Sequence, residues 1–173
     1  MKRFVFILGG ARSGKSRYAV DLAKKNKGKT VFIATAACLD AEMKERIRLH
    51  KISRPSSWKV IEEPKDISSV LCTLGKPYST ALVDCLGLWV SNLLMDEIKD
   101  RAIKKRIKEL ISAIFKTRVS TVIVVSNEVG GGVVPGDPLS RRFRDLVGLA
   151  NQSATEKADE VIFMQAGIPV KIK

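Results

Sequence analysis

The chain has 173 residues, about the size of one domain, and 45% of them are hydrophobic, which is enough to build a substantial core. Lys and Arg number 31 against 18 Asp and Glu, so the net charge is +13. A surface of this charge attracts polyanions such as nucleotides, nucleic acid or an anionic membrane, and a generally basic solvated surface is an equal alternative. We expect residues 1–173 to form a single α/β domain.

Two further exclusions concern disulfides and membranes. The three cysteines, Cys38, Cys72 and Cys85, form no C-x-x-C pair and are odd in number, which argues against a disulfide framework or a zinc site. Reduced thiols favour a cytoplasmic chain. No apolar stretch reaches the length of a membrane span, and the apolar run at residues 4–8 leads into glycines, so it predicts a buried strand rather than a signal peptide.

Short apolar runs alternate with helical patterns along the chain. In chain order the sequence predicts a strand at 4–8, a helix at 15–25, a strand at 31–34, a helix at 41–50, a strand at 81–83, helices at 86–95 and 99–116, a strand at 122–125, a helix at 139–155, a strand at 161–164 and a short edge strand at 169–172. Nearly all-apolar strands are typical of parallel strands buried on both faces. The alternation therefore predicts a mostly parallel sheet flanked by helices.

The segment between the first predicted strand and the first predicted helix matches G-x-x-x-x-G-K-[ST] in full, through Gly9, Gly10, Ala11, Arg12, Ser13, Gly14, Lys15 and Ser16. Glycines let several backbone N–H groups point at one anion, and the helix N-terminus adds partial positive charge. We expect Lys15 to reach the β- and γ-phosphates of a nucleoside triphosphate. The Ser16 hydroxyl is expected to ligate Mg²⁺.

Asp84 directly follows the predicted strand at 81–83. A carboxylate at this place can reach the magnesium shell of a nucleotide bound to the phosphate loop. The alternative is that Asp84 caps the helix that follows. We favour the metal or nucleotide role, because a phosphate loop needs an acidic partner.

His50 is the only histidine of the chain. It shares the apolar face of the predicted helix 41–50 with Met43 and Ile47, which by itself favours a packed histidine. The surrounding stretch is basic through Arg46, Arg48, Lys51 and Arg54. So much positive charge disfavours the imidazolium form, and a neutral imidazole is a nucleophile. The spacing permits attack on phosphorus.

The glycine-rich segment 127–132 follows the strand at 122–125, where ligands bind in such sheets. Its Asn127 and Glu128 suit substrate contact, and a loose surface loop is the alternative. Arg141, Arg142 and Arg144 on the next predicted helix can face phosphate or water.

These residues together resemble the bifunctional adenosylcobinamide kinase / adenosylcobinamide-phosphate guanylyltransferase family, nearly from end to end. Besides the phosphate loop at 9–16, the resemblance is carried by I-A-T-A at 33–36, D-x-E-M-x-x-R-I-x-x-H at 40–50, R-P-x-x-W-x-x-I-E-E-P at 54–64, D-C-L-x-L-W-V-x-N-L-L at 84–94, V-S-N-E-V-G at 125–130 and R-D-x-x-G-x-x-N-Q at 144–152. The family pattern differs at Gly87 and at 134–136, on the corrinoid side of the site.

The resemblance implies a RecA-like P-loop fold, commonly assembled as a homotrimer, and two reactions. ATP or GTP phosphorylates adenosylcobinamide, and GMP is then transferred from GTP to adenosylcobinamide phosphate through a GMP–histidine intermediate on His50. The implied nucleotide contacts beyond the phosphate loop are Ala34, Thr35, Ala36, Lys51, Ile52, Ser53, Arg54, Glu62 and Asp84. Mg²⁺ is implied as the cofactor, with Ser16 and Asp84 as its ligands.

Two other functions compete with this interpretation. A plain small-molecule kinase would use only the phosphate loop and Asp84, without a covalent nucleotide. An ATP-driven nucleic-acid-binding module would explain the charge of +13. The sequence contains no recognisable base-stacking motif, so we expect no nucleic-acid partner.

Overall fold

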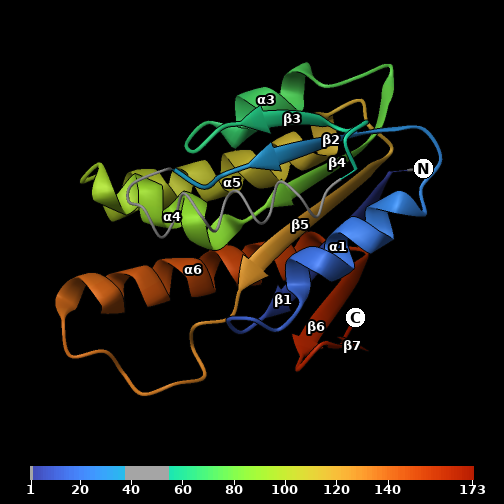
Figure 1. The fold of residues 1–173 in the computed structure, drawn as a ribbon. Coiled ribbons are helices and arrows are strands. Elements are labelled where there is room, and N and C mark those ends of the chain that lie inside the picture. The colour runs from blue at the N-terminus through green and yellow to red at the C-terminus, as the bar shows by residue number, and fades with distance from the viewer. Residues whose placement is uncertain (1, 38–54) are drawn as a thin grey trace.

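The computed structural model describes residues 2–37 and 55–173. A seven-stranded sheet with the order β3-β2-β4-β5-β1-β6-β7 forms its frame (Figure 1). The strands are β1 (Arg3–Gly9), β2 (Lys29–Ala34), β3 (Lys59–Glu62), β4 (Tyr78–Asp84), β5 (Thr121–Asn127), β6 (Glu160–Gln165) and β7 (Ile168–Lys171). Neighbouring strands of this sheet are parallel, except that β7 returns antiparallel along β6.

Helices cover both faces of the sheet (Figure 1). They are α1 (Lys15–Lys24), α3 (Ile67–Thr73), α4 (Leu86–Met95), α5 (Asp100–Lys116) and α6 (Pro138–Lys157). The helix α1 packs on one face, whereas α3 to α6 pack on the other. None of the helices in the described ranges has the length and apolarity to cross a membrane.

The first strand shows why the centre of the sheet is buried on both sides. Phe4, Phe6 and Leu8 enter the core under α3 to α6, while Val5 and Ile7 enter the core under α1. Successive side chains of a strand point to opposite faces, so a continuous apolar run fills both cores at once. The predicted α/β fold with a mostly parallel sheet is therefore confirmed.

Most predicted elements are confirmed, with boundaries that differ by a few residues. The last long helix begins at Pro138 rather than 139, because the Asp137 carboxylate accepts a hydrogen bond from Ser140 N and caps it. The sequence patterns predict neither β3 nor α3, which the structure shows. The predicted helix 41–50 lies outside the described residues.

Parallel order brings the carboxyl ends of β3, β2, β4, β5, β1 and β6 to one edge of the sheet. In this register Ala34 lies beside both Asp84 and Glu62, and Gly9 lies beside Asn127. The predicted site residues at strand ends are thus neighbours across the sheet, at the edge where such folds bind ligands.

Candidate nucleotide-binding site

The phosphate loop connects β1 to α1 by a tight turn. Arg12 and Gly14 both adopt left-handed backbone conformations, with φ of 54° and 89°. Ser13 N donates to the Gly10 carbonyl at 3.4 Å. Gly14 is the N-cap of α1 and no side chain caps this helix. The first N–H groups of α1 are therefore available to an anion held by the loop.

Lys15 lies inside this loop. Only 8% of the residue is exposed, and its Nζ donates to the Gly10 carbonyl at 2.7 Å. A carbonyl is a weaker partner for an ammonium group than a phosphate oxygen. The geometry therefore holds the lysine charge at the centre of the loop, where phosphate oxygens would compete for it.

The loop packs against the turn between β6 and β7. A side chain at Gly9 would come within 2.6 Å of both the Met164 carbonyl and the Ser13 hydroxyl, so only glycine fits there. Gly167 N donates to the Ser13 carbonyl at 3.1 Å. The buried Ser13 hydroxyl itself has no hydrogen-bond partner among the described residues.

Asp84 lies at the carboxyl end of β4. Thr35 N donates to the Asp84 carbonyl at 3.1 Å, which joins the ends of β2 and β4. The helix that follows has Cys85 as its N-cap and no side-chain cap. The interpretation of Asp84 as a helix cap is therefore wrong, and its carboxylate remains a candidate for the metal or nucleotide role.

Thr35 and Cys85 form a reciprocal pair beneath this edge. Cys85 N donates to Thr35 Oγ1 at 2.7 Å, and the Thr35 hydroxyl donates to the Cys85 carbonyl at 2.7 Å. Asn92 Nδ2 donates to the Thr35 carbonyl at 2.8 Å. Thr35 is fully buried, so its hydroxyl is used for hydrogen bonds within the protein interior. Nothing in the sequence indicates this pair beyond the two motif blocks that contain it.

Burial raises the pKa of the Cys85 thiol to about 12, and the Asp84 charge adds to the shift while Lys15 opposes it. Both charges thus act on this buried thiol, in opposite directions. Because only a thiolate is nucleophilic, Cys85 is inert at neutral pH.

The end of β5 completes this edge. Glu128 N donates to the Gly9 carbonyl at 3.0 Å, so the glycine-rich loop starts beside the phosphate loop. Asn151 from α6 supports the same strand end, since it accepts from Ser126 Oγ at 2.6 Å and donates to the Asn127 carbonyl at 3.0 Å. Gly87 packs against Asn127, where an added Cβ would lie 3.2 Å from Nδ2.

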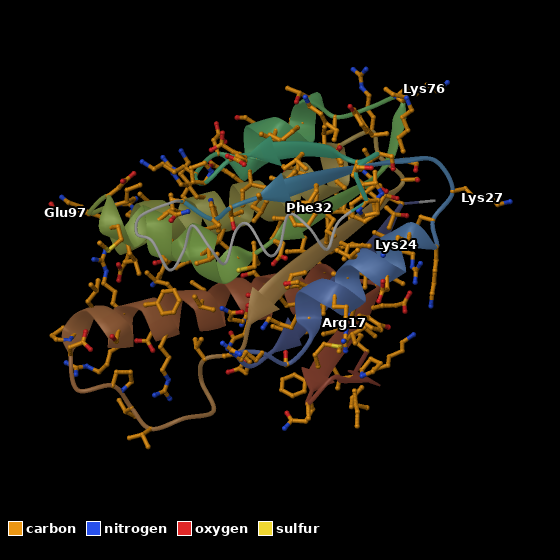
Figure 2. The ribbon with its side chains drawn as sticks, viewed as in Figure 1. Arg17, Lys24, Lys27, Phe32, Lys76 and Glu97 are labelled. Carbon is orange, nitrogen blue, oxygen red and sulfur yellow. The ribbon has the colours of Figure 1, made fainter. Side chains whose placement is uncertain are left out.

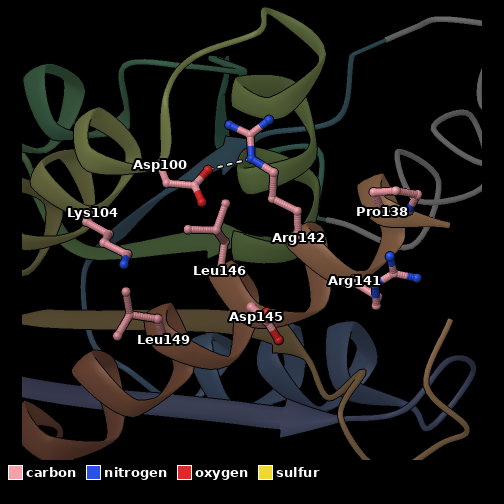
Figure 3. Close-up of a pocket in the computed structure, with 8 residues that line it drawn as sticks. All are labelled: Asp100, Lys104, Pro138, Arg141, Arg142, Asp145, Leu146 and Leu149. Atoms are coloured by element: carbon pink, nitrogen blue, oxygen red, sulfur yellow. Dashed lines mark hydrogen bonds and ion pairs between the residues drawn. The ribbon is translucent and has the colours of Figure 1, made fainter. Parts of the chain in front are cut away.

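The arginines of α6 have other partners. Arg141 donates to the Pro135 and Gly136 carbonyls of its own loop, and Arg142 forms an ion pair with Asp100 and donates to the Ile98 carbonyl. Arg141 and Arg142 line a cavity of about 460 Å³ between α5 and α6, separate from the phosphate loop (Figure 3). Of the predicted arginines, Arg144 has a buried Nη1 without a hydrogen-bond partner in the described part of the chain.

The remaining predicted residues divide into two groups. Ala34 and Glu62 end β2 and β3 next to each other, and Ala36 follows shortly after β2. His50, Lys51, Ile52, Ser53 and Arg54 lie outside the described residues.

P-loop nucleotide-binding proteins with a RecA-like sheet are the class that this fold and this site define. A solved structure of the RadB recombinase superposes with a TM-score of 0.57, covering 93% of this chain and 73% of the other, at 14% identity. Identity this low supports the fold alone.

The chain belongs to the cobinamide kinase / cobinamide phosphate guanyltransferase family, whose profile matches residues 5–172. The bifunctional adenosylcobalamin biosynthesis protein CobP of Pseudomonas aeruginosa is 41% identical over 167 residues, which is 96% of this chain and 95% of the relative. The bifunctional adenosylcobalamin biosynthesis protein CobU of Escherichia coli K12 is 36% identical, over 98% of this chain and 99% of the relative. The protein of the same name in Salmonella typhimurium LT2 is 37% identical with the same coverage. The family resemblance is confirmed, and these names indicate an enzyme with kinase and guanylyltransferase activities.

Proposed function

We propose that the chain catalyses two consecutive reactions at the edge formed by the phosphate loop and Asp84. In the first, adenosylcobinamide is phosphorylated by ATP or GTP. In the second, GMP moves from GTP to adenosylcobinamide phosphate by way of His50, which gives adenosylcobinamide-GDP and pyrophosphate. The observation that carries the proposal is the phosphate loop with Lys15 at its centre, in a chain of this family.

In the kinase step the hydroxyl of the aminopropanol arm attacks the γ-phosphorus. The new O–P bond forms as the bond between that phosphorus and the β,γ-bridging oxygen breaks, and the nucleoside diphosphate leaves. Lys15 exchanges the Gly10 carbonyl for phosphate oxygens and offsets the charge that develops on them. The N–H groups of the first turn of α1, which no side chain caps, hold the same phosphates.

The residues around the loop also fit Mg²⁺. Ser16 and Asp84 offer hard oxygen donors, and Mg²⁺ prefers one or two such protein ligands together with phosphates. The described residues contain no cluster of three or more acidic, histidine or cysteine side chains, so a site shared with the nucleotide fits better than a purely protein cage. When bound, the ion neutralises phosphate charge.

In the guanylyl step the His50 imidazole nitrogen attacks the α-phosphorus of GTP and pyrophosphate leaves. An oxygen of adenosylcobinamide phosphate then attacks the same phosphorus, breaks the N–P bond and restores the imidazole. Two displacements spare the enzyme from aligning two large substrates in one step. Ala34, Thr35, Ala36, Lys51, Ile52, Ser53, Arg54 and Glu62 are proposed as further nucleotide contacts.

The decisive experiment is incubation of the protein with α-labelled GTP and Mg²⁺, followed by mass spectrometry for a GMP adduct. We expect acid-labile GMP on the peptide that contains His50. The His50→Asn variant should lose the adduct and the second reaction but keep phosphorylation of adenosylcobinamide.

Two results would contradict this proposal. A GMP adduct that persists in the His50→Asn variant would place the covalent site elsewhere. A wild-type protein that phosphorylates adenosylcobinamide without any adduct would be a plain small-molecule kinase.

From the family resemblance we extend the proposal to a cytoplasmic homotrimer. Sedimentation velocity at several protein concentrations measures the assembly directly. A monomer throughout would remove the trimer from the proposal without affecting the chemistry.

A further inference from the structure

Several exposed basic side chains lie together at the end of the molecule where the central strands begin. Lys24, Lys27 and Lys76 lie at this end, whereas Glu97 lies at the opposite end (Figure 2). We define the basic end face by six exposed side chains around the starts of β2, β4 and β5, namely Lys25, Lys27, Lys29, Lys76, Lys116 and Arg118. The nucleotide site occupies the other edge of the sheet.

Backbone and side-chain contacts join the parts of this face into one surface. Ser79 Oγ donates to the Lys27 carbonyl at 2.7 Å, which links the segment before β2 to β4. Arg118 N donates to the Leu74 carbonyl at 3.3 Å, and the Arg118 side chain lies over Gly75. The face therefore extends from the end of α1, across the sheet, to the end of α5.

The charge of the face is not neutralised locally. Within the described residues, no side chain of the basic end face forms an ion pair with a carboxylate. Acidic residues near this end have other partners, since Asp21 pairs with Lys24 and Glu156 pairs with Lys157. Asp159 accepts from Phe4 N at 2.7 Å, and Glu160 pairs with Arg3.

Two simpler explanations leave most of the face unexplained. Lys25 and Lys116 lie at the C-terminal ends of α1 and α5, where a cation is favoured by the helix dipole. Lys27, Lys29, Lys76 and Arg118 are in connecting segments or at a strand start, where no such effect acts. Attraction of triphosphates is also a poor explanation, because the phosphate loop follows the carboxyl end of β1, whereas the face surrounds the amino ends of β2, β4 and β5.

We infer that the basic end face docks on the anionic phospholipid headgroups of a membrane surface. Clustered lysines on an open surface suit headgroup phosphates, because the flexible side chains can reach a plane of charge without a shaped pocket. Phe115 next to Lys116 is 47% exposed and adds an apolar side chain at the rim of the face. The face contains several lysines but only one arginine.

Nucleic acid fits this face less well than a lipid surface does. Proteins bind single-stranded nucleic acid in a groove that carries several aromatic rings. They recognise duplex sequence through arginine side chains that donate two hydrogen bonds to one base. Two cavities are lined from α5, α6 and the loop before α6, away from this face. Phe115 is the one large aromatic side chain of the described part that is exposed, and its ring packs edge-on against Phe4.

Docking by this face would leave the nucleotide site accessible. The strands run from the basic end face to the edge that carries the phosphate loop, so a membrane at the amino ends faces away from Lys15. The chain would act as a peripheral protein whose catalytic edge remains open to water-borne nucleotide. Docking of this face on a membrane does not depend on which reactions the site performs.

The test is co-sedimentation of the full-length protein with phosphatidylglycerol/phosphatidylcholine vesicles and with pure phosphatidylcholine vesicles, at about 0.15 M salt. We expect binding to the anionic vesicles only. The variant Lys27→Glu/Lys29→Glu/Lys76→Glu should lose affinity by about a hundredfold or more, since each basic side chain near such a surface contributes about fivefold. Its melting temperature and kinase rate should remain those of the wild type.

The matched control is Lys99→Glu/Arg101→Glu/Lys108→Glu, which changes the net charge equally at exposed positions of the α5 region. It should keep most of the vesicle affinity. If both triple variants lose affinity equally, net charge and not the face governs binding, and the inference fails. A milder Lys27→Gln/Lys76→Gln variant should give an intermediate loss, which guards against a folding defect in the reversal variant.

Two further results would overturn the inference. The first is a wild-type protein that does not bind anionic vesicles at this salt concentration. The second is tighter binding of single-stranded or duplex DNA or RNA than of vesicles at the same salt, abolished by the Lys27/Lys29/Lys76 variant, which would assign the face to nucleic acid.

Discussion

At the scale of single residues, Lys15 carries the largest expected functional effect. Its ammonium group lies inside the phosphate loop and donates to the Gly10 carbonyl at 2.7 Å. Replacement by alanine removes the charge that offsets developing phosphate charge, so kcat/KM for phosphorylation should fall by about two to three orders of magnitude. Steady-state kinetics with adenosylcobinamide measures this. The variant Lys24→Ala, exposed on the same helix, should retain wild-type kinetics and serves as the control.

Thr35 is expected to matter first for stability. In Thr35→Val the Cys85 N–H loses its acceptor in a buried place, so the free energy of unfolding should fall by about 1–3 kcal/mol. The conservative Thr35→Ser variant keeps the hydroxyl and should lose less. Urea unfolding followed by circular dichroism compares them. Equal stability of the two variants would show that the pair with Cys85 does not support this edge.

Cys85 should resist alkylation although it lies beside the site. Its pKa of about 12 leaves the thiol neutral at pH 8, and the residue is buried, whereas Cys72 is exposed. Iodoacetamide at pH 8 should modify Cys72 in the native protein and Cys85 only after unfolding, as read by peptide mass spectrometry. Rapid native labelling of Cys85 would contradict the packing around Thr35.

The raised pKa of Cys85 also affects the stability of the protein at high pH. The thiol ionises near its ordinary value of 9.0 when the chain unfolds, but near 12 in the folded protein. Its contribution is therefore complete below pH 9 and is lost as the pH rises from 9 towards 12. Cys85→Ala should show a shallower loss of stability across this interval than the wild type.

At the scale of elements, α3 shows what local sequence can and cannot reveal. The helix has seven residues and is held by its cap, because Ser69 N donates to Asp66 Oδ1 at 3.1 Å. So short a segment presents too few turns for a helical period to stand out. The strand β3 was missed for a related reason, since Lys59, Val60 and Glu62 are exposed and give no apolar run. Tertiary contact, not local pattern, fixes both elements.

The capping bond of α3 provides a test at this scale. The hydrogen bond from Ser69 lowers the pKa of Asp66, so the charged cap supports the helix above its unfolded pKa of about 4 and is lost as the pH falls through the lowered value. Asp66→Ala should cost about 1 kcal/mol at pH 7. Asp66→Asn should cost less and should remove the pH dependence. Thermal melts at pH 7 and at acidic pH check both expectations.

At the scale of the whole molecule, nucleotide binding should stabilise the fold. A ligand at a hundred times its dissociation constant adds about 2.7 kcal/mol. For a chain of this size this corresponds to a rise in melting temperature of about 5–10 °C. Differential scanning fluorimetry with GTP and Mg²⁺ should show the rise, and Lys15→Ala should abolish it. If chelation of the metal leaves the rise unchanged, Ser16 and Asp84 do not hold an ion with the nucleotide.

The sequence predicts where the candidate site lies better than it predicts the hydrogen bonds that hold the site together. The motif at 9–16 and the acidic end of β4 follow directly from residue types and parallel order. The Thr35–Cys85 pair and the support of β5 by Asn151 join residues far apart in the chain, which no local pattern reveals. The net charge of +13 likewise does not reveal which basic side chains lie together, because that depends on which termini of strands and helices meet.

The close approach of the final hairpin to the phosphate loop has a practical consequence for engineering. Gly167 N bonds the Ser13 carbonyl, and the Met164 carbonyl leaves no room beside Gly9. The last two strands therefore support the phosphate loop from one side, although they are remote from it in the chain. Shortening the protein before β6, or inserting residues at the β6–β7 bend, would therefore disturb the conformation of the phosphate loop.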